Sequence, residues 1–414
     1  MNSRTDVLVI GGGATGAGIA RDLALREVDV TLVERDGLAA GASGRSHGLL
    51  HSGARYAEAD EAGARECLRE NRILRAIGGE CVRHTRGLFV QLAGDDPDYF
   101  EEKRDACADI GIPTEVVDAN EIRAELPALN HDVERAMWVP DGVVVPSRLV
   151  AANAADARDH GAKILTHAPV TSMTLEEGED GPGTREISQV SIGGELERTI
   201  EPEIVINAAG AYAEGIGELA GVSIPMRPTR GVMVSVEYDA FEPVLNRCRD
   251  PDDGDIIVPH DEEVVLGTTS VPVNDPDEYE QPAWEVERTI TECSKLVPDV
   301  SERAITRTWW GVRPLYEPDE AARGGRGISR GFVRLDHADD GVENFLSIVG
   351  GKLTTYRQMA EATADLVCEK LEVDAECLTA DVSLPNAEDP VKLDAYVREF
   401  DAGGPSDADI LGRR

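Results

Sequence analysis

The stretch that most restricts the fold lies at the N-terminus of the chain. Residues 7–10, Val-Leu-Val-Ile, form a short apolar run that is typical of a strand buried on both faces. Residues 17–25 have the pattern of a helix, and residues 28–33 form a second apolar run that leads into Glu34. The first run and the helix are joined by glycines with the spacing G-x-G-x-x-G, namely Gly11, Gly13 and Gly16. This order predicts a βαβ unit that binds a dinucleotide.

Each part of this unit has a physical reason. Gly11 allows a tight turn, Gly13 lets the backbone approach a pyrophosphate, and Gly16 lets helix and strand pack closely. The N-terminus of the helix then directs its N–H groups and the positive end of its dipole toward the phosphates. Glu34 lies eighteen positions after Gly16, near the roughly 20 expected of a ribose-binding acid. The alternative is a glycine-rich turn that binds no ligand.

Composition excludes several classes of partner. The 414 residues suffice for two domains, or for one domain with a large insertion. The net charge of −38 argues against nucleic acid and against anionic membrane surfaces. Only six of the 41 basic residues are lysine, so the acidic, lysine-poor surface predicts adaptation to high salt. The alternative is an acidic protein of ordinary salt tolerance.

Cysteine usage and hydropathy restrict the compartment. The seven cysteines form no C-x-x-C pair, so we expect no disulfide framework and no metal site, and we infer a reducing compartment. The first strand begins near residue 6, and no stretch approaches 18 uncharged apolar residues. We therefore expect no signal peptide and no transmembrane segment. The expected location is the cytoplasm, with at most peripheral attachment to the inner face of the membrane through partners.

Two further apolar strands end in small residues and lead into helices. Residues 204–206 precede Ala208, Ala209 and Gly210, and residues 345–349 precede Gly350 and Gly351. Small residues at such turns let a ligand approach the backbone, although each could be an ordinary βα turn. Between these units, residues 227–316 alternate short strands with Pro- and Asp-rich turns, which predicts an antiparallel sheet.

These elements predict an α/β fold in which a Rossmann-like domain is interleaved with a mostly antiparallel sheet. We expect a discontinuous nucleotide-binding domain of residues 1–80, 140–225 and 325–385. A substrate-binding domain is expected for residues 81–139 and 226–324. Residues 386–414 are predicted to be a linker or the start of a truncated C-terminal domain.

Polar side chains concentrate at three places outside the glycine turns. A long loop after Glu34 is rich in small residues, and loops of this length inside a domain are usually functional. It contributes Ser43, Ser46, His47, His51, Arg55 and Tyr56. Arg313 precedes Pro314, which restricts its backbone to extended conformations, and Lys352 stands beside Gly351 at a helix N-terminus. The alternatives are structural histidines, an ordinary ion pair for Arg313 and a solvated surface lysine.

The pattern resembles the flavin-dependent oxidoreductases of the D-amino-acid-oxidase type and, more closely, the FAD-dependent glycerol-3-phosphate dehydrogenases. Residues 11–18 (GGGATGAG), 51–56 (HSGARY), 311–315 (GVRPL) and 350–357 (GGKLTTYR) carry this resemblance. Residues 44–56 and the run Asn-Arg-Cys-Arg at 246–249 resemble the catalytic A subunits of the anaerobic type. The similarity extends from about residue 4 to 390, and the acidic composition suggests a member from a halophilic archaeon.

The resemblance implies oxidation of sn-glycerol 3-phosphate to dihydroxyacetone phosphate, with hydride passing from C2 to N5 of FAD. Electrons would continue to quinone through partner subunits of a membrane-associated complex. The positions implied to contact FAD are Gly11, Gly13, Ala14, Thr15, Gly16, Glu34, Arg35, Ser43, Ser46, His47, Gly48, Val170, Ala208, Ala209, Gly210, Gly350, Gly351, Lys352, Leu353 and Thr354.

The implied reaction needs a cationic clamp for a phosphate dianion and a base for the C2 hydroxyl. Candidates for the clamp are Arg55, Arg313, Arg330 and Lys352, with Tyr56 and Thr354 as added donors. His51 is the first candidate for the base. An arginine or lysine could instead stabilise a developing alkoxide, so the catalytic candidates are His51, Arg55, Arg313 and Lys352.

Two features depart from the family pattern. The aerobic relatives carry lysine where this chain has Gly48, and the anaerobic A subunits continue into a Cys-rich domain suited to an iron–sulfur cluster, which is missing before Arg414. Alternative functions are a related FAD enzyme acting on another 2-hydroxy acid or an amine, or a flavin subunit inactive without that domain. A dehydrogenase that uses NAD fits less well, because three glycine-ended turns suit the elongated FAD.

Overall fold

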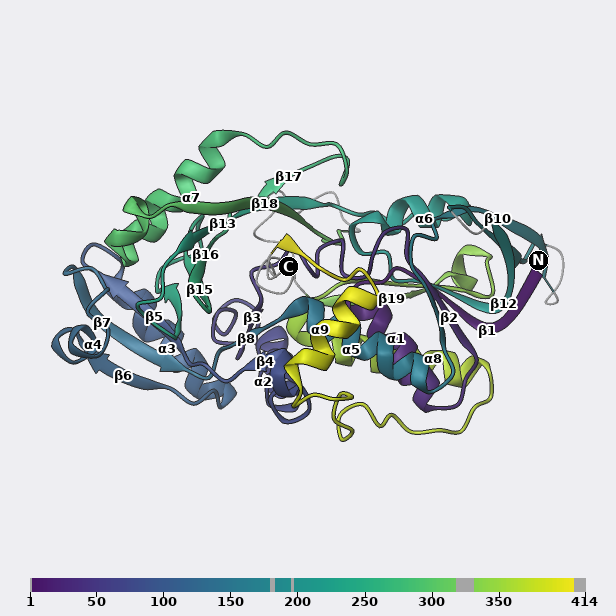
Figure 1. Cartoon of the computed structure of the whole chain (residues 1–414), viewed down its shortest axis with the longest axis horizontal. Coiled ribbons are helices and arrows are strands. Elements are labelled where there is room, and N and C mark those ends of the chain that lie inside the picture. Colours follow the sequence, from purple (N-terminus) through teal and green to yellow (C-terminus); the bar gives the residue numbers. More distant parts are fainter. Residues whose placement is uncertain (1, 179–182, 195–196, 318–330, 406–414) are drawn as a thin grey trace.

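The computed structural model describes residues 2–178, 183–194, 197–317 and 331–405. Within these residues the strands form an eight-stranded sheet, a nine-stranded sheet and a small three-stranded sheet. The two large sheets lie toward opposite ends of an elongated molecule (Figure 1). The expected α/β fold, with a parallel sheet and a mostly antiparallel one, is confirmed.

The eight-stranded sheet has a parallel centre. Its parallel strands, in spatial order, are β9 (Lys163–Leu165), β2 (Val30–Val33), β1 (Asn2–Ile10), β12 (Arg198–Asn207) and β20 (Phe345–Gly350). Antiparallel strands extend it on the β12 side, namely β10 (Val170–Glu177), β11 (Arg185–Ile192) and β19 (Phe332–Asp336). Because parallel strands end at one edge, the turns after β1, β2, β12 and β20 meet there.

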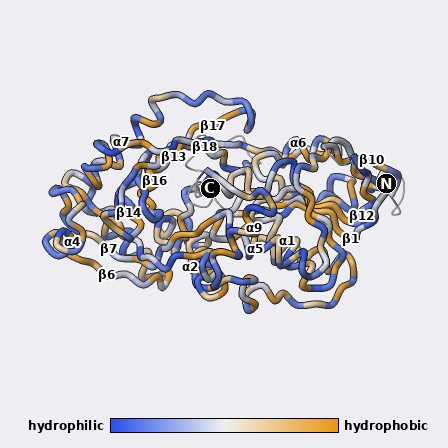
Figure 2. The backbone as a smooth tube through the Cα atoms, viewed as in Figure 1, coloured by the Kyte–Doolittle hydropathy of each residue, from blue (hydrophilic) through white to orange (hydrophobic). Residues whose placement is uncertain are grey.

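Side-chain alternation in β1 explains why both faces of this sheet are covered. Val7 and Val9 lie in the core cluster that includes residues of α1 (Ala14–Leu25), α5 (Pro146–Asp159) and α8 (Tyr356–Lys370). Leu8 and Ile10 belong to a second cluster on the opposite face, formed with β10 and β11. The strongest hydrophobic colouring follows these central strands, whereas the loop between β17 (Val271–Pro272) and α7 (Ala283–Leu296) is largely hydrophilic (Figure 2).

The nine-stranded sheet is built from two separate stretches of the chain. Among its described strand pairs, β14 with β5 is parallel and the others are antiparallel. Its main path runs β17, β13 (Thr229–Glu237), β16 (Glu263–Gly267), β15 (Ile256–His260), β14 (Val244–Arg247), β5 (Gly87–Leu92), β7 (Val133–Val139) and β6 (Glu115–Asp118), with β18 (Ile305–Arg313) beside β13.

The remaining elements join and cover the two sheets. The small sheet consists of β3 (Leu49–Leu50), β8 (Gly142–Val144) and β4 (Val82–Arg83), and α7 packs on the large antiparallel sheet. The other helices are α2 (Glu61–Ile77), α3 (Pro97–Ile110), α4 (Ala119–Glu125), α6 (Ala213–Leu219) and α9 (Pro390–Glu399). None of the helices in the described ranges combines the length and apolar character needed to cross a bilayer.

The structure extends one expected strand. Residues 204–206 were expected to be a strand, and they form the end of β12, which spans 198–207. The polar run Glu201-Pro202-Glu203 interrupts the hydrophobic pattern, yet β1 pairs along the strand on both sides of it. For residues 386–414 the expectation was a linker or the start of a truncated C-terminal domain. Helix α9 buries Leu393 and Val397 in the same core cluster as α1 and α5.

We predict that His260 makes stability depend on pH. This residue of β15 is buried, its Nε2 donates to the carbonyl oxygen of His47 at 3.0 Å, and burial lowers its pKa from 6.5 to about 4. Between these values the unfolded chain binds a proton that the folded chain does not, so stability falls as pH falls through this window. The loss attributable to His260 is about 3 kcal/mol.

The measurement is urea unfolding of wild type and His260→Gln between pH 4 and 8 in concentrated salt. Gln can still donate to the same carbonyl but does not titrate, so its stability should depend less on pH below about 6.5. Parallel pH curves for the two proteins would contradict the prediction.

Candidate functional site

A long cavity lies at the edge where the parallel strands end. Its volume is about 840 Å³, inside the range of roughly 300–1,000 Å³ usual for small-molecule sites. A smaller cavity of about 200 Å³ adjoins it and shares Ala14, Ser43, Pro314, Gly350 and Met359 with its lining. The second cavity receives residues from both large sheets, since Arg313 ends β18 and Gly350 ends β20.

The glycine turn after β1 forms the floor of the long cavity. Gly11 has φ +113°, and a Cβ there would lie 2.5 Å from the carbonyl oxygen of Ala208. A Cβ on Gly16 would lie 1.9 Å from the carbonyl oxygen of Gly11, so helix and strand need glycine at this contact. Gly13 begins α1 without a capping side chain, and a Cβ there would meet only Ser43 Oγ, at 3.2 Å. Gly13 therefore faces the cavity, where the helix N-terminus suits a pyrophosphate.

Glu34, the acid after β2, is hydrogen-bonded to the glycine turn that follows β1. Glu34 lines the long cavity, and its carboxylate accepts the backbone N–H of Gly12 at 2.7 Å and that of Asp36 at 3.0 Å. Ala14 N–H donates to Ser43 Oγ at 2.9 Å, which ties the loop after β2 to the start of α1. These contacts keep the carboxylate at the mouth of the turn, the position of a ribose-binding acid.

The structure brings most of the predicted cofactor residues to the cavities. Those lining the long cavity are Gly11, Gly13, Ala14, Thr15, Glu34, Arg35, Ser43, Val170, Ala208, Ala209, Gly210 and Gly350. Those lining the smaller one include Ser46, His47, Gly351, Lys352 and Leu353. Gly16, Gly48 and Thr354 lie behind the lining and contact neither cavity. A cavity of about 840 Å³, a helix N-terminus reached over Gly13 and an acid at the second strand fit the ADP half of FAD.

The smaller cavity collects polar side chains suited to an anionic substrate. His51, Tyr56, Arg313 and Lys352 all line it. The hydroxyl of Tyr56 lies 3.3 Å from Nε2 of His51, and the Lys352 Nζ lies 4.6 Å from the centre of the Tyr56 ring. Thr354 holds the backbone of His51 in place, because its hydroxyl accepts the backbone N–H of His51 at 3.0 Å. The cavity thus combines two cations with a histidine and a hydroxyl.

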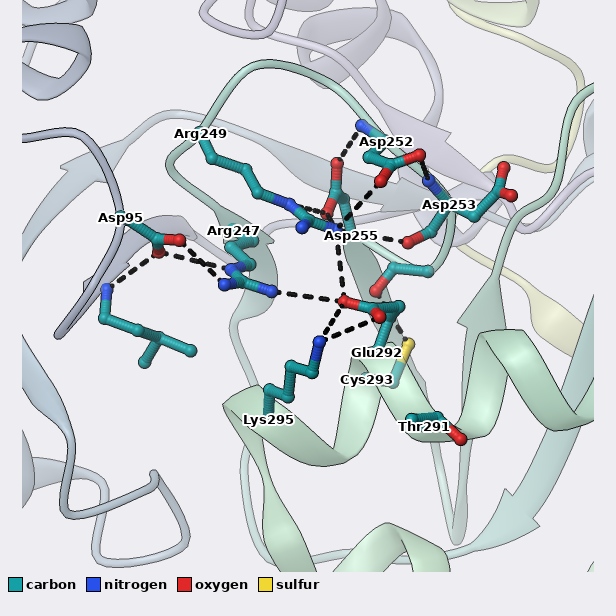
Figure 3. A network of polar contacts seen from close by, with 12 residues as sticks. Asp95, Arg247, Arg249, Asp252, Asp253, Asp255, Thr291, Glu292, Cys293 and Lys295 are labelled. Carbon is teal, nitrogen blue, oxygen red and sulfur yellow. Dashed lines mark hydrogen bonds and ion pairs between the residues drawn. The ribbon is translucent and has the colours of Figure 1, made fainter.

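Arg55 is placed differently from the prediction. It lines neither cavity, and its guanidinium lies 3.8 Å from the carboxylate of Asp255. Burial raises the pKa of Asp255, and the charge of Arg55 opposes that rise. Asp255 also accepts Arg249 at 2.8 Å and belongs to a network that includes Arg247 and Glu292 (Figure 3). Arg55 therefore connects the loop that carries His51 to this buried ionic network.

The loop is also fixed by Asp141, which sequence reasoning did not identify. Its Oδ1 accepts the backbone N–H of Ser52 at 2.7 Å, and Asn246 donates to Oδ2 at 3.4 Å. Burial raises the pKa of Asp141. The predicted substrate residue Arg330 lies outside the described residues.

The contact of Asp277 with Arg35 and Tyr212, at the long cavity, was also not predicted from the sequence. Asp277, in the loop before α7, accepts both terminal nitrogens of Arg35 at 2.8 and 2.9 Å and the hydroxyl of Tyr212 at 2.7 Å. The Arg35 guanidinium lies 4.0 Å from the centre of the Tyr212 ring, and its hydrogen bonds lower the pKa of Asp277. Tyr212 follows the Ala208–Gly210 turn, so proximity to that turn could have identified it. Nothing local in the sequence connects Asp277 to this site.

Comparison with known proteins gives a consistent result. The family model for FAD-dependent oxidoreductases named DAO matches residues 6–366. The chain is 49% identical to the A1 subunit of anaerobic glycerol-3-phosphate dehydrogenase from Haloferax volcanii, over 100% of this chain and 71% of that protein. It is 45% identical to the A subunit of the anaerobic glycerol-3-phosphate dehydrogenase from Escherichia coli K12, over 94% of this chain and 71% of that one.

Solved structures show the same fold at lower identity. Glycerol-3-phosphate dehydrogenase from Bacillus halodurans, complexed with FAD, has a TM-score of 0.69 at 20% identity and covers 99% of this chain and 77% of that one. L-alpha-glycerophosphate oxidase from Mycoplasma pneumoniae, with FAD bound, has a TM-score of 0.74 at 18% identity and covers 92% and 99%.

The two glycines predict different effects of one added methyl group. In Gly13→Ala the Cβ would project into the cavity where the pyrophosphate is expected, so we expect the Kd for FAD to rise at least ~10-fold while the melting temperature of the cofactor-free protein changes little. In Gly16→Ala the Cβ overlaps the backbone of Gly11, so we expect lower stability even without cofactor. Flavin absorbance after gel filtration, fluorescence titration with FAD and thermal unfolding separate these effects. A yellow Gly13→Ala protein with wild-type FAD content would contradict the pyrophosphate assignment.

Proposed function

The chain belongs to the DAO family of FAD-dependent oxidoreductases, and on that basis we propose that it oxidises sn-glycerol 3-phosphate to dihydroxyacetone phosphate. Its cofactor is FAD. The observation that carries the proposal is the group of His51, Tyr56, Arg313 and Lys352 around a small cavity next to the cofactor cavity. The names of the relatives that match most of the chain support the same substrate.

The substrate would bind through its phosphate. A dianion needs positive charge and donors in a protein whose net charge is −38, and Arg313 and Lys352 supply both within one cavity. Arginine can bind two phosphate oxygens through its planar fork, and lysine acts as a point charge. The hydroxyl of Tyr56 would add a donor.

The chemistry would use the chain's own groups to handle the proton. FAD, when bound, supplies the acceptor for the hydride that leaves C2. The C2 hydroxyl must lose its proton, and we propose His51 as the base, oriented by Thr354 at its backbone and by Tyr56 at its ring. Stabilisation of the developing alkoxide by Arg313 or Lys352 is the alternative. Arg55 would hold the loop that carries His51 in place through its ion pair with Asp255. We also propose Arg330 as a ligand of the substrate phosphate.

Competing substrates use similar groups. A 2-hydroxy acid or an amine carrying a carboxylate could also bind Arg313. Two cations, Arg313 at the end of β18 and Lys352 just after β20, favour a dianionic phosphate over a single carboxylate. We also propose that the two large sheets are the cores of the nucleotide-binding and substrate-binding domains, so that the site lies at their junction.

The proposal extends to the electron acceptor. Relatives named as subunits of an anaerobic dehydrogenase support partner subunits, and we propose that electrons pass through these to quinone at the cytoplasmic face of the membrane. We propose as well that the protein is adapted to high salt, since its net charge is −38 and a Haloferax protein is 49% identical to it.

The decisive experiment is anaerobic reduction of the bound flavin. Adding glycerol 3-phosphate to the holoprotein should bleach the flavin, and Arg313→Ala should lower kcat/KM with a dye acceptor by about 2–4 kcal/mol, roughly 30- to 900-fold. Arg65→Ala is the matched control, because Arg65 is an exposed arginine of α2 away from the cavities. No bleaching, or bleaching by lactate or an amino acid instead, would reject the proposed substrate.

Salt dependence tests the proposed adaptation. We expect the protein to refold and regain flavin in molar KCl and to lose structure when salt is removed, because screening weakens repulsion among its acidic side chains. Circular dichroism across a KCl series measures this. Full stability without added salt would rule the adaptation out.

A further inference from the structure

We propose that Glu285 is a positioning residue for Arg313 and acts through Thr269. A buried carboxylate on α7 would then determine where the guanidinium stands in the smaller cavity. The inference rests on the proposed function for its choice of substrate, and it adds residues that line neither cavity.

Glu285 is a fully buried anchor. Its side chain has an exposed fraction of 0%, and its Oε1 accepts two hydrogen bonds from Arg230, at 2.6 and 2.8 Å. Its Oε2 accepts the hydroxyl of Thr269 at 2.6 Å and the indole N–H of Trp310 at 3.3 Å. Donors thus reach both oxygens, from β13, β18 and the segment between β16 and β17, and hold the carboxylate in one position.

Thr269 transmits this position to Arg313. Its hydroxyl is fixed on both sides, since it donates to Glu285 and accepts the backbone N–H of Val232 at 3.1 Å. Its carbonyl oxygen accepts Nη2 of Arg313 at 3.0 Å, and the hydroxyl of Thr268 accepts the same nitrogen at 3.3 Å. The guanidinium of Arg313, a residue that lines the smaller cavity, is therefore linked to the buried carboxylate through Thr269.

The path of the Arg313 side chain depends on Gly231. Strands β13 and β18 pair with Gly231 opposite Gly311, and the guanidinium crosses β13 at Gly231 to reach the two threonines. A Cβ on Gly231 would lie 2.7 Å from Arg313 Nη2, 2.4 Å from Thr268 Oγ1 and 2.5 Å from the Thr269 carbonyl oxygen. An alanine at 231 would therefore displace the guanidinium without touching the cavity.

Such positioning has a clear physical use. A long arginine side chain loses rotamer entropy when it binds, and holding it beforehand reduces that cost and places the charge where the reaction needs it. A buried pair such as Arg230–Glu285 is weak evidence for stability alone, because desolvation offsets the attraction. The competing explanation is that the pair only attaches α7 to the sheet.

The first test uses variants that alter the anchor and keep its shape. In Glu285→Gln and Thr269→Val we expect kcat/KM for glycerol 3-phosphate to fall roughly 10- to 100-fold, mainly through KM, and the Ki of inorganic phosphate to rise in parallel. Flavin content should stay at the wild-type level. Ser235→Ala is the control, since Ser235 lies on β13, the strand of Arg230, and its hydroxyl donates to a different carboxylate, that of Glu263.

The second test asks whether these residues act through Arg313. Combined with Arg313→Ala, Glu285→Gln should cause no further loss of kcat/KM, whereas independent effects would add. Gly231→Ala should reproduce the loss while the Glu285 carboxylate is kept, because its Cβ would displace the Arg313 guanidinium and its contacts with Thr268 and Thr269, and it keeps the test available if Glu285→Gln does not fold. Unchanged KM and phosphate Ki in Gly231→Ala and Thr269→Val, or additive losses in the double variant, would overturn the inference. If wild type itself does not oxidise glycerol 3-phosphate, the proposed function fails instead, and the two failures are distinguishable.

Discussion

The close contact between Gly16 and the carbonyl oxygen of Gly11 determines where the rest of the site can lie. Because no Cβ separates them, α1 starts directly at the end of β1 and points its N-terminus into the cavity. The strands on either side of β1 then bring Glu34 and the Ala208–Gly210 turn to the same edge. Binding of the nucleotide and packing of the sheet thus depend on one backbone contact.

Local chemistry explains what the sequence could predict. The glycine turn, the apolar strands and the acid after β2 all belong to one βαβ unit, so spacing alone identifies them. The pairing of Arg55 with Asp255 joins residues far apart in the chain, and no local pattern distinguishes an arginine that binds substrate from one that meets a buried acid. The pairing of Asp277 with Arg35 likewise joins residues far apart in the chain. Which side chains meet across two sheets depends on tertiary packing, and the hydrophobic periodicity of the sequence does not predict that packing.

The acidic composition has a structural counterpart inside the protein. Several buried arginines away from the cavities are held by carboxylates, as Arg247 is by Asp95 and Glu292 and Arg357 by Glu70. Each pair gives a buried arginine charge a partner, which desolvation otherwise makes costly. An abundance of acids therefore serves the interior as well as the surface. Figure 3 shows one such group, where Arg247, Arg249 and Lys295 surround Glu292.

The packing of the last described residues has a consequence for the order of folding. Leu38 donates its backbone N–H to the carbonyl oxygen of Phe400 at 3.1 Å, and a Cβ on Gly37 would lie 2.0 Å from the Asp401 carbonyl oxygen. The loop after β2 therefore reaches its final form only when nearly the whole described chain has left the ribosome. Synthesis proceeds from the N-terminus, so the nucleotide unit is made first and completed last. Completion of this loop, which lines the long cavity, then waits until residues 400–401 have been synthesised.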